Sequence, residues 1–255
     1  MSLTAGCPRC ATPVASTGDG DTWSCPEHGV VQPLWRPEQA AYATFVDHLA
    51  LADGFPTYLP WPLGPGWEVS DFAVVRSGAA VATLTLVSGT TDLDGPVEVM
   101  VVAEEAGVGL GARCAGTVGA DPGPEVGDGP PMTKVKVGNQ QVSLWPVSLW
   151  GAGEHADSAA DPVTDPVPDR VTDPVNGPAS ESAASTGGPD DGGPDDGGPW
   201  SRSAVVGEAA GRWLWLVFRP ASAILMLRDE WILRDVSDLG PSLVELPFGG
   251  GSGSW

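Results

Sequence analysis

Four residues near the start of the chain have the types and the spacing of metal ligands. Two residues separate Cys7 from Cys10, and after fourteen more residues the same spacing separates Cys25 from His28. Two side chains spaced in this way on a tight turn can reach a single ion, and thiolate sulfur with imidazole nitrogen suits tetrahedral Zn²⁺. The pattern predicts a zinc ribbon over residues 1–36. A shell closed by four protein ligands leaves no position for water or substrate, so the expected role of Zn²⁺ is structural.

A redox pair and disulfide bonds are the two alternatives to a metal site for these cysteines. A thioredoxin-like redox pair at Cys7 and Cys10 would open a helix after a strand, and no such pattern surrounds them. Disulfide bonds would suit a secreted protein, but residues 1–6 contain neither the basic segment nor the apolar stretch of a signal peptide. The sequence therefore favours a metal site in a protein of the reducing cytoplasm.

Short extended segments are expected to position the ligands. Residues 22–24 and 30–32 have strand character on either side of the second ligand pair, and a turn is expected at 17–20. Gly29 directly follows His28, where a positive φ would be tolerated at little cost. The sequence thus predicts a hairpin that brings the second pair back to the first.

The rest of the chain predicts an α+β fold, with a mainly antiparallel β-sheet domain and few helices beside the zinc ribbon. A helix is expected over 38–52, because its apolar residues recur at i, i+3, i+4 and i+7: Tyr42, Phe45, Val46 and Leu49. Short segments with strand character and tight turns follow, at 67–76, 79–88, 96–102, 134–137, 141–145, 212–219, 223–228, 231–235 and 242–246. Residues 213–218 are apolar on both faces, which predicts a central strand buried on both sides.

One stretch of the chain differs in composition from the rest. Residues 151–200 contain eleven acidic residues and one basic residue, with few large apolar ones, so we expect a disordered acidic insertion. The segments on both sides of it belong to one sheet, and a single domain is therefore expected over 37–150 and 201–248. Residues 249–255 are expected to form a flexible tail. No apolar run is long enough to cross a bilayer.

The overall charge argues against the commonest use of a zinc ribbon. Lys and Arg together number 12 and Asp and Glu number 33, which gives a net charge of −21. Affinity for nucleic acid comes mainly from basic side chains that neutralise phosphates. Nucleic-acid binding is therefore disfavoured.

Two loops could contact a ligand. The first, residues 58–67, contains three prolines and two glycines, with Trp61 and Trp67 as aromatic anchors. These tryptophans could pin the loop over the sheet, or they could form an aromatic binding groove.

The second loop follows a predicted strand and has the order Gly107, Gly109, Gly111, Arg113. Such a loop could bind a phosphate, with the arginine as a charge partner. However, Glu104 and the glutamate after it would repel an anion, and the glycines and prolines that follow break any long helix. A glycine-rich turn packed against the sheet is the alternative. No Ser-His-Asp or Cys-His arrangement is apparent, so no catalytic residues are predicted.

Several of these motifs together resemble a family of uncharacterised actinobacterial zinc-ribbon proteins, a domain of unknown function. They are Cys7-Pro-Arg-Cys10 with Trp23-Ser-Cys-Pro-Glu-His28, and the segments 59–67, 101–113 and 207–215. The resemblance covers most of the chain except 151–200. Some members of the family carry a phosphotransacetylase label, but nothing in this chain resembles that enzyme's large α/β architecture.

The sequence as a whole favours a non-enzymatic binding or adaptor protein with a structural zinc ribbon, whose partner is a protein or a small molecule. The tryptophan-rich loop is the expected contact. The alternative is an enzyme or ligand-binding protein for a phosphorylated or acylated metabolite at residues 107–113. A nucleic-acid-binding zinc ribbon is the third possibility.

Overall fold

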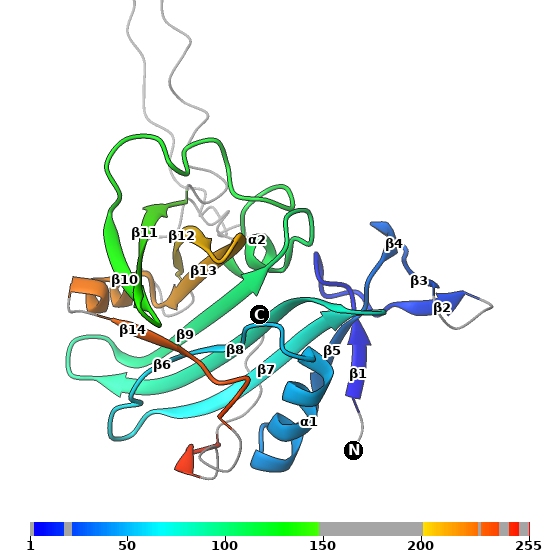
Figure 1. Cartoon of the computed structure of the whole chain (residues 1–255), viewed down its shortest axis with the longest axis horizontal. Coiled ribbons are helices and arrows are strands. Elements are labelled where there is room, and N and C mark those ends of the chain that lie inside the picture. Colours follow the sequence, from blue (N-terminus) through cyan, green and yellow to red (C-terminus); the bar gives the residue numbers. More distant parts are fainter. Residues whose placement is uncertain (1–2, 18–21, 148–200, 229–230, 240–244, 250–254) are drawn as a thin grey trace, which may run out of the picture.

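A computed structural model describes residues 3–17, 22–147, 201–228, 231–239, 245–249 and 255 (Figure 1). The predicted acidic insertion at 151–200 lies outside the described residues, as does most of the predicted turn at 17–20. Of the predicted flexible tail, only the first residue, Gly249, and the last, Trp255, are described.

Eleven of the fourteen strands in the described part of the chain belong to one large, mainly antiparallel sheet, as the sequence predicts. Its eleven strands follow in the spatial order β1 (Leu3–Gly6), β5 (Leu34–Pro37), β7 (Glu68–Arg76), β8 (Ala80–Thr91), β9 (Gly95–Glu104), β13 (Arg212–Arg219), β12 (Ser203–Ala209), β11 (Gln140–Pro146), β10 (Thr133–Val137), β14 (Ile232–Asp235) and β6 (Tyr58–Pro60). Among these neighbours, β10 and β14 run parallel and the other pairs run antiparallel.

The central strand β13 is buried on both sides, as its apolar sequence predicts. Leu214 and Leu216 face one hydrophobic core, whereas Trp215 and Val217 face the other. Successive side chains of a strand point to opposite faces, so a strand covered on both faces needs apolar residues without alternation. The protein therefore has two apolar cores, one on each side of the sheet.

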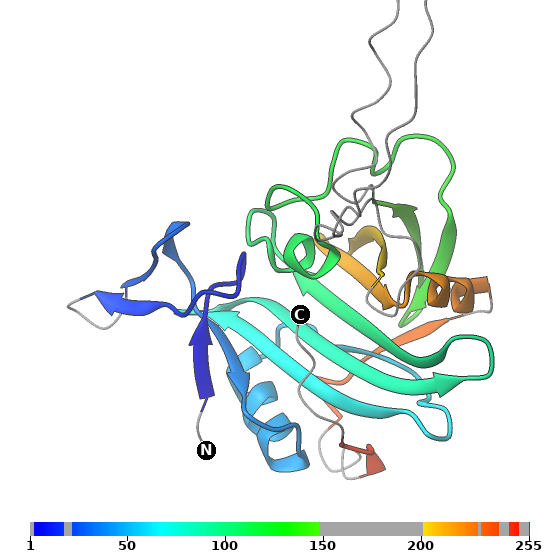
Figure 2. The same cartoon turned by 180° about the vertical axis from the view of Figure 1, so that it is seen from behind.

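The sheet curves over one of its own faces. Strand β6 lies at the far edge of the sheet, where it pairs with β14. The Thr85 hydroxyl of β8, in the middle of the sheet, nevertheless donates to the carbonyl oxygen of Tyr58 in β6, at 2.6 Å. The far end of the sheet therefore lies over β8. Figures 1 and 2 show this curvature, with β6 and β14 on the same side of the long strands as the helix α1 (Tyr42–Ala52). The first core fills the enclosed space.

The helix α1 is shorter than the predicted 38–52, and it buries a different face. Phe45, His48 and Ala52 are buried, whereas Tyr42 and Val46 are 39% and 41% exposed. Phe45 belongs to both the predicted and the buried set, and packing against the aromatic side chains of the core decides which of its neighbours are buried. His48 stacks on Phe45 at 5.6 Å between ring centroids, and burial lowers its pKa to about 3, so the ring is neutral.

The predicted strand at 223–228 is wrong, because the chain forms the 3₁₀ helix η1 (Ala221–Arg228) there. Pro220 ends β13, and its carbonyl oxygen accepts a hydrogen bond from the amide of Ala223 at 3.0 Å, which starts the 3₁₀ turn. The predicted strand at 242–246 lies largely outside the described residues. No helix in the described part of the chain has the length and apolarity needed to cross a membrane.

A small three-stranded sheet projects from one end of the molecule (Figures 1 and 2). It consists of β2 (Ala15–Thr17), β3 (Thr22–Cys25) and β4 (Gly29–Val31), with β3 in the middle. The hairpin predicted around the second ligand pair corresponds to β3 and β4. We call residues 7–31 the N-terminal lobe. The strands on either side of it, β1 and β5, both join the large sheet, so parts of the segment predicted as a ribbon form an edge of that sheet.

Candidate metal centre and its contacts

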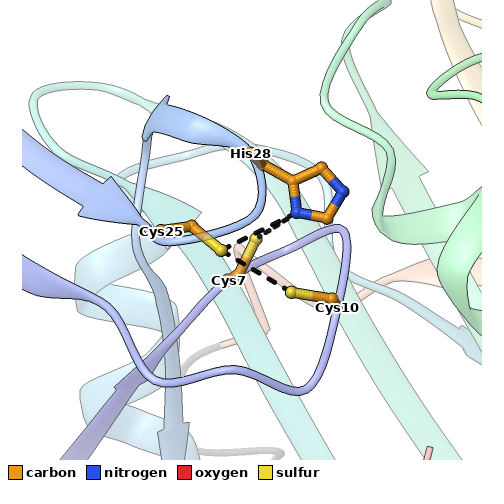
Figure 3. Close-up of side chains that lie close together, drawn as sticks. All are labelled: Cys7, Cys10, Cys25 and His28. Carbon is orange, nitrogen blue, oxygen red and sulfur yellow. Dashed lines mark hydrogen bonds between the residues drawn. The ribbon is translucent and has the colours of Figure 1, made fainter.

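The N-terminal lobe brings the four predicted ligands to one place (Figure 3). Cys7 follows the last residue of β1, and Cys25 is the last residue of β3. A tight turn then leads to His28, after which Gly29 adopts a φ of 67°, in the region that favours glycine. Cys7 and Cys25 are buried, Cys10 is half-buried and His28 is exposed. The lobe thus holds the cluster with its imidazole toward the surface.

The distances between the four side chains suit a tetrahedral ion. All four ligand atoms lie within 4.8 Å of one another. Cys10 Sγ lies 3.7 Å from Cys25 Sγ, and His28 Nδ1 lies 3.7 Å from both Cys7 Sγ and Cys25 Sγ. Tetrahedral Zn²⁺, with Zn–S near 2.3 Å and Zn–N near 2.0 Å, separates its ligand atoms by about 3.5–3.8 Å. These residues therefore lie close enough to bind a metal ion.

Hydrogen bonds hold the two ligand turns in position. The amide of Arg9 donates to Cys7 Sγ at 3.4 Å, and the amide of Cys7 donates to the carbonyl oxygen of Thr12 at 3.0 Å. The Thr12 hydroxyl in turn donates to the Glu27 carboxylate, at 3.2 Å, and so connects the first turn to the second. The cluster is thus supported by a second layer of contacts, as ordered metal sites usually are.

The thiols of the cluster have different electrostatic environments. Burial raises the pKa of Cys7 to about 11. Burial also opposes ionisation of Cys25, but hydrogen bonds with the His28 ring and with the amides of Glu27 and His28 outweigh it and lower the pKa of Cys25 to about 6. Thiolates this close together repel one another, and a cation among them removes that repulsion. The donor set fits a soft divalent ion such as Zn²⁺.

The glycine-rich loop considered as a possible phosphate site lies against the N-terminal lobe. The Arg9 guanidinium donates to the carbonyl oxygens of Gly107 and Val108, the second at 3.2 Å. From the other side, Arg113 Nη1 donates to the carbonyl oxygen of Cys7 at 2.7 Å. Gly109 lies under the Arg9 side chain, since a Cβ added there would be 3.0 Å from Arg9 Cγ. Beyond the strands β1 and β5, the N-terminal lobe therefore contacts the rest of the protein through this loop.

The amides that a bound phosphate would use already have an acceptor. The helix α2 (Leu110–Ala115) follows the loop, and the carboxylate of Glu104 accepts hydrogen bonds from the amides of Leu110, at 2.8 Å, and Gly111, at 3.2 Å. Glu104 is completely buried, and this burial raises its pKa to about 7. Gly111 lies on the ring of Trp215, which a Cβ would approach to 2.3 Å. The loop thus packs closely on the sheet, and the carboxylate of Glu104 already accepts the hydrogen bonds of the amides at the start of α2.

A second cluster, which we call the Trp255 clamp, lies next to the loop. It consists of Trp255, Arg36, Asp71 and Arg113. The indole Nε1 donates to the Asp71 carboxylate at 2.8 Å, and the two guanidinium carbons lie 4.6 Å (Arg36) and 5.0 Å (Arg113) from the ring centroid. Arg36 also pairs with Asp71, and Arg113 Nη2 donates to the backbone oxygen of Trp255 at 2.9 Å. Arg113, a member of the Trp255 clamp, therefore connects the clamp to the N-terminal lobe.

The two tryptophans of the proline-rich loop have different environments. Trp67 lies flat on β8, because a Cβ added at Gly89 would be 2.4 Å from its ring. Trp61 is half-exposed and lines a groove of about 310 Å³, together with Trp231, Met226, Ile232 and neighbouring loop residues. Trp67 thus packs on β8 and also contributes to the groove that Trp61 lines.

Several contacts at these sites could not be recognised from the sequence. Trp255 belongs to a segment that was expected to be a flexible tail, and only the fold brings Asp71 and Arg36 to it. Glu104 was considered as a repulsive charge, but it is the acceptor for the α2 amides. The sequence shows Arg9 next to the predicted ligand Cys10, but the carbonyl oxygens that accept its hydrogen bonds lie 98 and 99 residues further along the chain.

A comparison with protein-family models finds a match over residues 1–160 and 196–254, to a model described as a family of unknown function (DUF6758). Apart from residue 255, the unmatched residues are 161–195, which fall within the predicted acidic insertion. No curated protein matches the chain, and no solved structure does.

Proposed function

Because this chain belongs to the family of unknown function DUF6758, its activity has to be argued from its own residues, and we propose that it is a non-enzymatic binding or adaptor protein with a structural zinc centre. The observation that carries the zinc assignment is the tetrahedral spacing of three sulfurs and one imidazole nitrogen. With all four positions filled by the protein, Zn²⁺ when bound serves to fold the lobe. Thiolate ligands of this kind suit the reducing cytoplasm.

The metal would fix the lobe as a rigid part of the molecule. Between β1 and β5 the lobe has few buried apolar residues besides Cys7 and Cys25, so the lobe cannot be held by a hydrophobic core of its own. A cross-link between its two turns therefore supports the position of Arg9 on the Gly107 loop. The same cross-link supports the carbonyl of Cys7 that Arg113 contacts.

The partner of the protein would bind at the groove beside Trp61. This groove has half-exposed aromatic walls and is placed on the sheet by the pinned Trp67. Aromatic and apolar walls with little charge are typical of surfaces that bind peptides or small molecules.

The geometry favours this function over the enzyme considered as the alternative at residues 107–113. A phosphate or acyl group at that loop would compete with the Glu104 carboxylate for the amides of α2, and Arg113 already donates to two backbone oxygens. Nucleic-acid binding through the lobe is disfavoured for a similar reason, because the guanidinium of Arg9 contacts the loop.

The test of the metal assignment is the metal content of the purified full chain. We expect one Zn²⁺ per chain for the wild type, and a large loss of bound zinc for Cys25→Ser. Cys114→Ser is the matched control, because Cys114 is buried in α2, outside the cluster, and its substitution should leave the zinc content at one. Elemental analysis by mass spectrometry measures all three. A wild-type chain without stoichiometric metal, or equal zinc in both variants, refutes the assignment.

A second readout follows the lobe itself. Trp23 on β3 and Trp35 on β5 form an edge-to-face pair with centroids 5.3 Å apart. Removal of Zn²⁺ by a chelator should loosen this pair and change the near-ultraviolet circular dichroism of the wild type. The binding role is tested by affinity purification from native cells, in which Trp61→Ala should lose partners that Cys114→Ser retains.

A further inference from the structure

The surface beside the Trp61 groove carries an unusual charge for this protein. The chain has a net charge of −21 and contains two lysines, Lys134 and Lys136. Both are exposed on β10, and because they are two residues apart they lie on the same face of the strand. Lys136 is paired with Ile232, which lines the groove, and its amide donates to the carbonyl oxygen of Trp231 at 2.8 Å. Lys136 therefore lies beside a residue of the groove wall, and Lys134 is two positions away on the same face of β10.

A third basic side chain lies next to the groove, in an adjoining hollow that Trp61 and Ile232 also line. Arg234 is exposed on β14, and its guanidinium carbon lies 4.8 Å from the ring centroid of Trp61. The neighbouring Asp235 is exposed too, but its carboxylate accepts hydrogen bonds from two backbone amides, at 3.0 and 3.1 Å. Asp229 and Glu230, just before Trp231, lie outside the described residues. The described charges at this edge are thus predominantly basic, on a chain that is otherwise strongly acidic.

The shape of the groove indicates which kind of acidic partner fits. Its half-exposed tryptophans, Trp61 and Trp231, offer flat aromatic faces. The exposed Pro62 of the loop lines the groove beside them. Grooves lined by aromatic residues bind proline-containing segments, because the extended polyproline conformation is already ordered and loses little entropy on binding. A polynucleotide would also stack on aromatic rings, but as a long polyanion it would be repelled by the acidic surface beyond the lysines.

Resting on the proposed binding function, we infer that the groove takes an acidic, proline-containing segment of another protein. Its prolines would pack on Trp61 and Trp231, and its carboxylates would lie toward Lys134, Lys136 and Arg234. Aromatic packing would supply the affinity, and the basic side chains would supply the preference for acidic sequences.

The experiment measures fluorescence anisotropy of labelled 15-residue peptides with the zinc-loaded full chain. The probes are (Asp-Pro-Val)₅, (Lys-Pro-Val)₅ and (Asp-Ala-Val)₅. We expect the first to bind at least about tenfold more tightly than either of the others at low salt, with a preference that weakens as salt rises. The variant pair K134Q/K136Q should weaken binding of the acidic peptide, and K134E/K136E should weaken it further. Ile232→Ser, at the groove wall, should weaken it without a change in salt dependence.

Equal binding of the acidic and basic peptides, or no effect of the lysine variants, would overturn the inference. Stronger binding of a labelled oligothymidylate than of any peptide would overturn it too, in favour of nucleic acid. The described residues Val147 and Ala204 are adjacent, since the amide of Val147 donates to the carbonyl oxygen of Ala204 at 3.1 Å, so a variant with 151–199 replaced by a short linker is feasible. If the acidic peptide binds that variant but not the full chain, the chain's own acidic segment competes for the groove. The inference of a separate partner then fails.

These outcomes are separable from those of the proposed function. If none of the peptides binds but Trp61→Ala still loses its partners in the affinity purification, the groove is a binding site and only the partner class is wrong. If Trp61→Ala and the wild type retain the same partners and bind the peptides equally, the groove has no binding role and both proposals fail.

Discussion

The buried carboxylate of Glu104 predicts a specific dependence of stability on pH. Glu104 ends β9, is completely buried, and accepts hydrogen bonds from the amides of Leu110 and Gly111 at the start of α2. Burial disfavours the charged form and raises the pKa from 4.5 to about 7, although the two hydrogen bonds oppose the shift. The folded chain therefore holds this proton to a higher pH than the unfolded chain does.

The sign and size of the effect follow from the two pKa values. Because the folded-state pKa is the higher one, the contribution to stability is complete below pH 4.5 and is lost as the pH rises through 7. Between pH 5.5 and pH 8 the free energy of unfolding should fall by about 2 kcal/mol on account of this group. Glu104→Gln cannot ionise, so its stability should lack this component.

Urea denaturation followed by tryptophan fluorescence measures the difference. The free energy of unfolding is compared at pH 5.5 and pH 8 for the wild type, Glu104→Gln and the control Glu105→Gln, whose side chain is exposed. Staying at or above pH 5.5 limits proton competition for the metal ligands. The control should keep the wild-type pH dependence. If Glu104→Gln keeps it as well, the reasoning about the buried carboxylate is refuted.

Two further predictions concern packing around the loop, and both are checked by urea denaturation. Trp255→Ala removes the indole that donates to the buried Asp71, along with its cation–π contacts, and should cost about 3 kcal/mol, whereas Trp255→Phe should cost about half as much. No loss for Trp255→Phe would contradict a role for the N–H group, and equal losses for the two variants would contradict a role for the ring. Gly111→Ala places a methyl group 2.3 Å from the Trp215 ring and should cost about 2–3 kcal/mol. Gly107→Ala, with φ of 84° and open space, should cost about 1 kcal/mol, and the reverse order would contradict the packing argument.

The sequence predicted the metal-ligand candidates and the type of sheet because both depend on local patterns. Two ligands on one tight turn are recognised by their spacing, and the hairpin of β3 and β4 by strand residues around a turn. The central strand β13 was predicted for the same reason, since a run of apolar residues already shows that both faces are covered.

The errors and omissions arose where a choice depends on distant parts of the chain. Phe45 of helix α1 belongs both to the predicted face and to the buried one, and the contact of His48 with Phe72 on β7, at 5.2 Å between ring centroids, depends on packing that the sequence does not show. The strand predicted at 223–228 has strand-like composition, but Pro220 and the turn it starts favour a 3₁₀ helix. The sequence could not decide between two roles for the tryptophans, because the contact of Trp67 with Gly89 and the groove that both rings line depend on how the loop packs on the sheet.

By itself, the sequence determined which four side chains could hold a metal and that the main domain would be an antiparallel sheet with a doubly buried strand. Only the tertiary structure decided what the glycine-rich loop contacts. The contact of Arg9 with Gly107 spans 98 residues, that of Arg113 with Trp255 spans 142, and that of Trp255 with Asp71 spans 184. Spacing along the chain can reveal groups that meet within one turn, but groups this far apart are brought together by the packing of the whole sheet.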